Sequence, residues 1–116
     1  SYINAHGTST QVGDVGEVEA CRRVFGDGYV PPISSTKSMT GHAQGAAGAL
    51  EAIFCLLMLD NDFIAPSINV ETLAEGIREG EVATQLVENA GLDSVMTNSF
   101  GFGGTNGSMI LSKYKG

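Results

Sequence analysis

Basic residues are scarce in this sequence of 116 residues. Six Lys and Arg stand against 13 Asp and Glu, which gives a formal net charge of -7 at pH 7. Eight of the acids lie between positions 60 and 93, where Arg78 is the only base. Because phosphate binding needs clustered Lys and Arg, this composition argues against nucleic acid as a partner.

Long apolar runs are also absent. The sequence contains no continuous apolar window of about 18 residues, the length that a membrane-spanning helix needs. It shows no basic segment followed by an apolar stretch and a small-residue cleavage site, so no signal peptide is predicted. We therefore expect a cytoplasmic protein that makes no contact with a membrane, and the length corresponds to one domain or part of one.

Cysteine occurs only at Cys21 and Cys55, and neither belongs to a CxxC motif. This usage favours a reducing compartment, although a single disulfide between the two stays open. Cys55 lies in a run of large apolar residues, where we expect an inert buried thiol with a raised pKa. Cys21 falls within a predicted helix, so neither cysteine is a candidate nucleophile.

The residues that are present predict alternating strands and helices. A strand is expected over residues 1–5, and the chain looks as though it is entered in the middle of that strand. An amphipathic helix follows over residues 14–25, with acids in its first turns, where the helix dipole favours them. Residues 31–37 predict a second strand, and residues 93–99 and 108–113 predict a final pair joined by a glycine-rich loop. This order is typical of an α/β fold with a mixed sheet.

A second helix is predicted over residues 43–59. Gln44 and Glu51 are its only strongly polar members, so we expect a helix that is buried on most sides. Gly45 and Gly48 each cost up to ~1 kcal/mol relative to alanine within a helix, which indicates close approach by another element. Residues 70–92 are acidic and weakly periodic, and they form the least structured part of the prediction.

Three polar motifs fall where predicted strands end. They are His6-Gly7-Thr8-Ser9-Thr10, then Lys37-x-x-x-Gly41-His42-x-x-Gly45-Ala46-Ala47-Gly48, and finally Asn98-Ser99-Phe100-Gly101-Phe102-Gly103-Gly104-Thr105-Asn106. In α/β sheets such strand ends hold ligands. In this order and at these separations the motifs resemble the β-ketoacyl-acyl-carrier-protein synthases, above all the synthase I and II enzymes of fatty acid synthesis, and specifically their C-terminal half.

The resemblance implies a thiolase-like fold. We expect residues 1–116 to form the C-terminal βαβαββ half-domain, with a mixed sheet of the five-stranded type and one buried central helix. The nucleophilic cysteine of this family lies in the N-terminal half, which the sequence does not include. The expected activity is acyl transfer by decarboxylative Claisen condensation in fatty acid or polyketide biosynthesis, without a cofactor or a metal. The expected partners are acyl carrier protein with its thioesters, the missing half and a second copy of the protein.

The resemblance also implies roles for individual residues. His6 and His42 would be the paired histidines, Lys37 would position the site, and the Phe102 N–H would complete an oxyanion hole while its ring gates the acyl pocket. Thr8 and Thr10 would bind the pantetheine arm, and Phe100, Gly101 and Gly103 belong to the same substrate-binding loop. The side chains that would support the site, as counter-charges for Lys37, are Asp14, Glu17 and Glu51; the sequence does not choose among them.

Other interpretations compete with this one. Each histidine alone is typical of a hydrogen-bonded structural residue, and Lys37 of a solvated surface position. A zinc site at His6 and His42 with Asp14 or Glu17 would need a ligand spacing that the sequence lacks. A truncated chain could also act only as a binding or self-associating module, because a lone half would expose apolar helix and sheet faces.

Overall fold

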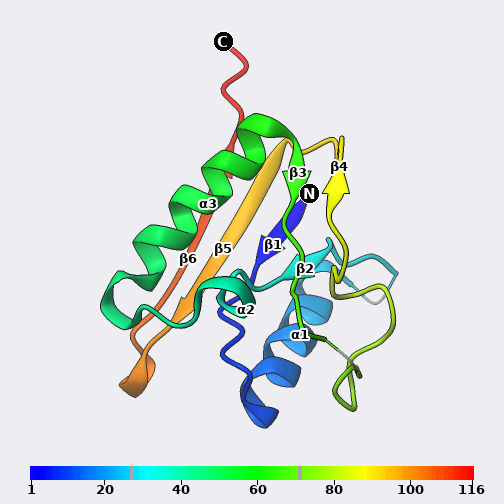
Figure 1. The fold of residues 1–116 in the computed structure, drawn as a ribbon, viewed down its shortest axis with the longest axis vertical. Coiled ribbons are helices and arrows are strands. Elements are labelled where there is room, and N and C mark those ends of the chain that lie inside the picture. Colours follow the sequence, from blue (N-terminus) through cyan, green and yellow to red (C-terminus); the bar gives the residue numbers. More distant parts are fainter. Residues whose placement is uncertain (27, 71) are drawn as a thin grey trace.

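Four strands form the principal sheet of the computed structural model, which describes residues 1–26, 28–70 and 72–116. β1 (Tyr2–Asn4) lies between β2 (Ile33–Ser34) and β5 (Ser94–Phe100) and is parallel to both (Figure 1). β6 (Asn106–Ser112) runs antiparallel along β5. The predicted α/β fold with a mixed sheet is confirmed.

A sheet of the five-stranded type was predicted, whereas the described residues form a principal sheet of four regular strands. Beyond β2 the sheet continues only as an isolated parallel bridge from Ile33 to Val82, with the Ala83 N–H donating to the Ile33 carbonyl at 2.7 Å. β3 (Phe63–Ile64) and β4 (Val87–Glu88) pair instead in a separate antiparallel ribbon. The residues around Val82 lack the run of β-branched and aromatic side chains that would extend the pairing.

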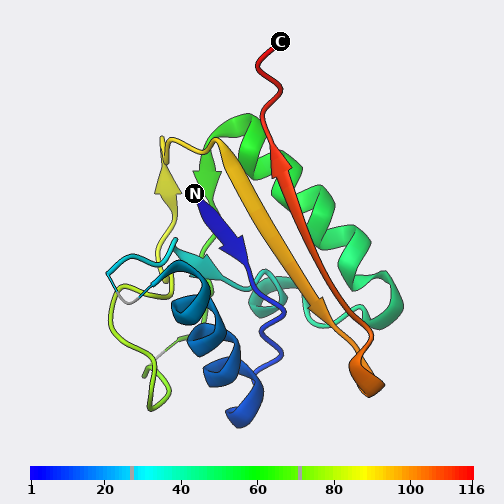
Figure 2. The same cartoon turned by 180° about the vertical axis from the view of Figure 1, so that it is seen from behind.

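Helices cover both faces of the sheet. Figures 1 and 2 show α3 (Ala47–Asn61) on one side of the strands and α1 (Gln11–Phe25) on the other. Since successive strand residues point to opposite faces, β1 and its extension divide their side chains between two cores. Tyr2 packs with Cys55 and Met58 of α3, whereas Ile3 and its neighbours pack with α1. The two cysteines lie in different cores and are free.

The predicted helix over 43–59 is wrong in its start and in its burial. Residues 44–46 form a 3₁₀ turn (Gln44–Ala46), and the α-helix begins at Ala47. One face of α3 is buried against the sheet, but four apolar residues on it are 39–53% exposed, namely Leu50, Ile53, Leu56 and Leu57. Burial on most sides would require a second layer over α3, and the described residues supply none.

The close approach expected at the helix glycines holds for one of them. A Cβ on Gly48 would lie 3.3 Å from Ser99 Oγ, so this glycine lets α3 approach the end of β5. At Gly45 no described atom lies within 4 Å of the corresponding position. The packing within this chain therefore explains Gly48 and gives no reason for Gly45.

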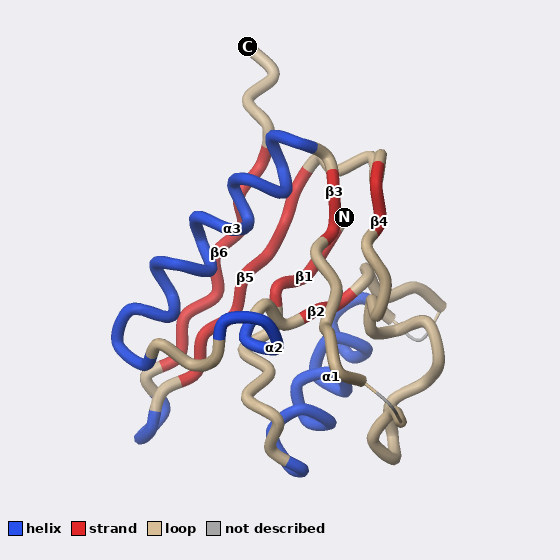
Figure 3. The backbone as a smooth tube through the Cα atoms, viewed as in Figure 1, coloured by secondary structure: helices blue, strands red, loops and turns tan. Residues whose placement is uncertain are grey.

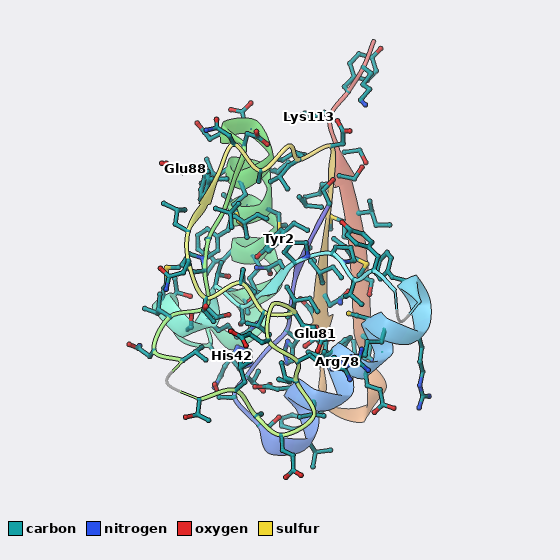
Figure 4. All side chains as sticks on the ribbon, turned by 90° about the vertical axis from the view of Figure 1, so that its right-hand side faces the viewer. Tyr2, His42, Arg78, Glu81, Glu88 and Lys113 are labelled. Atoms are coloured by element: carbon teal, nitrogen blue, oxygen red, sulfur yellow. The ribbon has the colours of Figure 1, made fainter. Side chains whose placement is uncertain are left out.

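The acidic stretch after β3 is mainly loop, as predicted (Figure 3). An ion pair holds it to α1, since the Arg22 guanidinium donates to both carboxylate oxygens of Glu81 and to the Gly76 carbonyl. The Arg78 N–H donates to the same carboxylate, and Figure 4 shows Arg78 and Glu81 together beside α1. The pKa of Glu81 is lowered, and the hydrogen bonds from Arg22 are the main cause.

The helices in the described part of the chain are all too short or too polar to cross a membrane. The remaining elements are α2 (Lys37–Thr40), directly after β2, and a short turn (Phe102–Gly104) between β5 and β6. Both lie at the carboxyl ends of the parallel strands, which is the edge of the sheet where His6 leaves β1.

Candidate active site

The carboxyl ends of three parallel strands bring the predicted polar residues together. His6 follows β1, Lys37 opens the helix after β2, and Phe100 ends β5. Figure 4 shows His42 at this end of the molecule, while Glu88 and Lys113 lie toward the opposite end. Parallel strands order their carboxyl ends along one edge, which explains why residues so far apart in sequence meet there.

The two histidines meet edge to face. The ring centroids of His6 and His42 are 5.6 Å apart, and the ring planes are at 90°. The Phe100 ring packs against His6 on another side, with centroids 5.5 Å apart and an interplanar angle of 59°. His6 is half-buried, and His42 is exposed. The structure thus assembles a pair of imidazoles bordered by an aromatic ring.

The tautomer of the His42 ring follows from its hydrogen bond. Its Nδ1 accepts from the Gln44 N–H at 3.1 Å, so we assign the proton of the neutral ring to Nε2. α3 begins five residues after His42, so this contact is with the 3₁₀ turn that precedes the helix. His42 therefore presents an Nε2–H donor at the exposed side of the pair.

Glu17 of α1 holds the backbone that carries His6. One of its carboxylate oxygens accepts from the His6 N–H at 2.9 Å and the other from the Gly7 N–H at 3.1 Å. Ser35 Oγ donates to the Gly7 carbonyl at 2.9 Å from the other side. Gly7 has a φ of +38°, and a Cβ there would lie 2.6 Å from Ser35 Cβ, so only glycine fits this turn. Burial raises the pKa of Glu17, and the two backbone donors and Asn98 oppose that effect.

His6 lies in surroundings that disfavour its charged form. Burial is the main cause that lowers the pKa of His6, and the positive charge of Lys37 lowers it further. His6 Nδ1 is buried and has no hydrogen-bond partner among the described residues. A neutral imidazole is therefore the prevailing form of His6 at pH 7.

Lys37 is buried and paired with Glu51 of α3, which decides among its three candidate counter-charges. The two side chains are only 5% and 3% exposed. The other oxygen of Glu51 is buried without a partner among the described residues. Glu17 is used by the His6–Gly7 backbone, and Asp14 lies in the first turn of α1, where its charge acts on His6 only at a distance.

The glycine loop between β5 and β6 is short and tightly folded. The Gly101 N–H donates to the Thr105 carbonyl at 2.8 Å, and a Cβ on Gly101 would lie 2.8 Å from that same oxygen. Gly103 has a φ of +77°. The Phe102 ring is fully exposed, and its N–H has no acceptor among the described residues. Phe100, rather than Phe102, is the aromatic residue that touches His6.

The threonines of the first motif lie on the loop between His6 and α1. Thr8 is half-buried and Thr10 is exposed. Thr10 precedes the first residue of α1 without a side-chain capping bond. Both hydroxyls are therefore near the histidines in the chain and available to another molecule.

Comparison with known proteins decides the family. The sequence profile described as "Beta-ketoacyl synthase, C-terminal domain" matches residues 1–71. The chain belongs to the β-ketoacyl synthase family. It is 65% identical over 115 residues to 3-oxoacyl-[acyl-carrier-protein] synthase 1 of Haemophilus influenzae and 55% identical over 114 residues to the enzyme of that name from Escherichia coli. These alignments cover 99% and 98% of this chain but 28% of each relative's length.

Solved structures agree with this assignment. A β-ketoacyl synthase from Burkholderia phymatum superposes with a TM-score of 0.89 at 39% identity, over 99% of this chain and 28% of that one. A ketosynthase in complex with its type II polyketide synthase acyl-carrier protein gives 0.87 at 30% identity, over 98% and 28%. The thiolase-like fold predicted for the chain is thereby confirmed.

The cysteines of this β-ketoacyl synthase chain are both buried away from the histidine pair. Burial raises the pKa of the Cys55 thiol to about 12, and it also raises the pKa of the Cys21 thiol. The described residues contain no group of three or more His, Cys, Asp or Glu that could hold a metal ion. Glu17, a proposed zinc ligand, already accepts two backbone N–H groups.

The sequence reasoning missed two side chains that support the β-ketoacyl synthase site. Ser35 bonds the Gly7 carbonyl, and Asn98 of β5 approaches Glu17. Ser35 follows β2 directly, and Asn98 lies in β5 between two hydroxyl residues. Asn98 opens the third motif and Ser35 lies two residues before Lys37, and this position was the only signal in the sequence that could have indicated a role for them.

Proposed function

We propose that this chain forms the C-terminal half-domain of a β-ketoacyl-acyl-carrier-protein synthase and supplies the charge-stabilising side of its active site. The complete enzyme would condense an acyl thioester with malonyl-acyl carrier protein in fatty acid or polyketide biosynthesis, in the cytoplasm. The observation that carries the proposal is the pair of imidazoles of His6 and His42 with ring centroids 5.6 Å apart. Family membership and the relatives' names support it.

The pair suits a reaction in which negative charge develops on oxygen. When a malonyl thioester loses CO2, the electron pair of the broken C–C bond passes into an enolate centred on the thioester oxygen. The carbon end of the enolate then attacks the acyl carbonyl, a new C–C bond forms, and the cysteine thiolate leaves. An N–H aimed at the enolate oxygen stabilises it, typically by ~3 to 4 kcal/mol for each well-placed donor. His42 offers its Nε2–H, and His6 is held in the neutral form that the role needs.

The other catalytic and binding roles follow from the surroundings of the histidines. Burial is the main cause that lowers the pKa of His6, and the Lys37 charge, held in place by Glu51, lowers it further. The free N–H of Phe102 is suited to an acyl oxyanion, and its exposed ring is suited to a gate for the acyl chain. Phe100, Gly101 and Gly103 complete this substrate-binding loop, and Thr8 and Thr10 would hydrogen-bond the pantetheine arm of acyl carrier protein.

The nucleophile has to come from outside these 116 residues. Cys55 and Cys21 are buried in the two cores, with raised pKa values that suppress the thiolate. We therefore expect the isolated chain to be inactive in condensation. We expect the remaining part of the synthase to cover the exposed apolar face of α3.

The test compares decarboxylation of malonyl-acyl carrier protein by the complete synthase with that by its His6→Ala and His42→Ala variants. Each variant is expected to lower kcat by roughly 10²–10³. A Glu19→Gln variant, on the exposed face of α1, should keep the wild-type rate. Wild-type decarboxylation by either histidine variant would refute the proposal, and so would condensation by the 116-residue chain alone.

A second candidate function is a non-catalytic module that only binds or self-associates. The apolar residues exposed on α3, Leu50, Ile53, Leu56 and Leu57, favour it, because such a patch promotes association. In this case the purified chain should form dimers or larger species that an Ile53→Glu exchange disperses. Light scattering that finds a monomer at high concentration would dismiss this candidate.

A further inference from the structure

Asn98 and Ser108 form a cross-strand pair at the base of the glycine loop. They face each other in the register of β5 and β6, and Ser108 Oγ donates to Asn98 Oδ1 at 2.8 Å. This bond fixes the direction of the amide, because the oxygen is turned toward β6 and the Nδ2 group toward α1. There Nδ2 lies 3.5 Å from Glu17 Oε1. Asn98 and Glu17 are only 5% and 7% exposed.

Glu17 in turn fixes the segment that carries His6. Its two oxygens accept the N–H groups of His6 and Gly7, and these are the only acceptors that the described residues offer to those two amides. Any change in the direction of the carboxylate therefore changes the position of the His6 backbone. Among the described residues, the Glu17 carboxylate makes the only hydrogen bonds between α1 and the His6–Gly7 backbone.

The Glu17 carboxylate is not closely packed on every side, so packing alone does not fix its direction. A cavity of about 250 Å³ borders Glu17, Gly7 and Ser9, and it continues toward the loop that carries Ile68 and Leu73. A side chain next to such a space keeps its rotamer only if polar partners hold it. Asp14 borders the same cavity, and its charge repels a carboxylate that swings toward it. Among the described residues, the Asn98 amide is the only side-chain donor that holds the Glu17 carboxylate in its present direction.

We propose that Asn98 is a positioning residue that links the glycine loop to His6, through hydrogen bonds from Ser108 to Asn98 and from Asn98 to Glu17. The loop from Phe100 to Thr105 is the tip of the hairpin whose base is this pair. A shift of β6 relative to β5 at that tip turns the amide and loosens Glu17. Two parts of the active site that are far apart in sequence are thereby coupled. That the coupling serves condensation rests on the proposed function, whereas the coupling itself does not.

Amide hydrogen exchange measured by NMR on the ¹⁵N-labelled protein tests this link. Ser108 is exposed, so Ser108→Ala removes the hydroxyl without emptying a core. We expect hydrogen exchange of the His6 and Gly7 amides to become about fivefold faster, because the loss of one typical hydrogen bond changes an equilibrium by about that factor. The Ala5 amide, which donates to the Ser34 carbonyl within the sheet, should keep its rate. The midpoint of the His6 ring titration should rise toward the ordinary value, since looser packing of this segment reduces the burial that lowers it.

Two further variants separate positioning from general weakening of the hairpin. Ser108→Thr keeps the hydroxyl and should restore wild-type exchange at His6 and Gly7. Ser112→Ala breaks the equivalent cross-strand bond between Ser94 and Ser112 on the same strands, 2.8 Å long, and should leave both amides unaffected. Wild-type exchange at His6 in Ser108→Ala, or equal acceleration in Ser112→Ala, would overturn the proposal. Since none of these readouts needs turnover, a failed decarboxylation assay would remove the proposed function and leave this coupling intact.

Discussion

Lys37 and Glu51 are joined by a buried ion pair that ties the helix after β2 to α3. Both side chains are almost fully shielded from water, with 5% and 3% exposure. The pair brings a positive charge close to His6 and at the same time fixes where α3 approaches the sheet. Stability and the electrostatics of the histidines therefore depend on one contact.

Removing one partner of this pair should be costly. Glu51→Gln leaves the Lys37 ammonium buried without a counter-charge, and we expect a loss of about 3–5 kcal/mol in the free energy of unfolding. Glu19→Gln breaks the exposed pair with Arg23 and should cost at most about 0.5 kcal/mol. Urea denaturation of the two variants gives the comparison. Equal losses would mean that burial of the Lys37 pair does not matter.

Removing both charges should be less harmful than removing one. In Lys37→Met/Glu51→Leu the apolar side chains fill a similar volume without a desolvated charge, and we expect most of the stability lost in Glu51→Gln to return. The pKa of His6 should nevertheless rise in the folded double variant, because the Lys37 charge that lowers this pKa is gone. A double variant as unstable as the single one would contradict this expectation.

The titration of His6 should make the fold less stable in mild acid. Its folded-state pKa lies below the ordinary value of 6.5, chiefly because of burial, so the unfolded chain takes up the proton first as the pH falls. The contribution of His6 to stability is present above pH 6.5 and is lost as the pH falls from there to the folded pKa. NMR titration should show His6 with a midpoint below 6.5, and Lys37→Met should raise that midpoint. A Lys113→Met variant, at the opposite end of the molecule, serves as the control and should leave the midpoint unchanged.

The cysteines should be inert until the protein unfolds. With a pKa of about 12, the Cys55 thiol is almost fully protonated at mildly alkaline pH, and no solvent reaches it. Iodoacetamide should label both cysteines slowly in the native protein and fast in urea, as mass spectrometry can follow. Labelling of the native protein at the rate of a free thiol with a pKa of about 8.5 would contradict this prediction.

The two faces of α3 should differ in their response to truncation. Met58 is 1% exposed and packs beneath the sheet, so Met58→Ala should cost about 2–5 kcal/mol. Leu56 is 50% exposed on the same helix, and Leu56→Ala should change stability by no more than about 0.5 kcal/mol. Thermal or urea unfolding of the chain measures both. Similar losses would show that the outer face of α3 is covered.

Much of the fold and of the site could be predicted because the relevant patterns are local. The motifs at His6, Lys37 and Phe100 each follow a short β-branched or aromatic run, and parallel pairing brings the ends of such runs together. The exposure of α3 could not be predicted, since its sequence reports only that the helix is apolar, not what covers it. The link from Asn98 to Glu17 joins residues 81 positions apart, so no spacing in the sequence reveals it.

A buried network of polar side chains on β1 and its neighbouring strands fixes the register of β1 in the sheet. Asn4 donates to Tyr2 and Thr36 and accepts from Thr97, and the Tyr2 hydroxyl contacts Ser34. If β1 slipped by one residue, Asn4 would face the apolar core under α1 without partners, at a cost of about 1–3 kcal/mol for each unsatisfied group. The same slip would send His6 to the wrong side of the sheet. Tyr2 and Asn4 therefore select a single alignment of β1. The position of His6 is set when the sheet forms, because misaligned sheets are less stable.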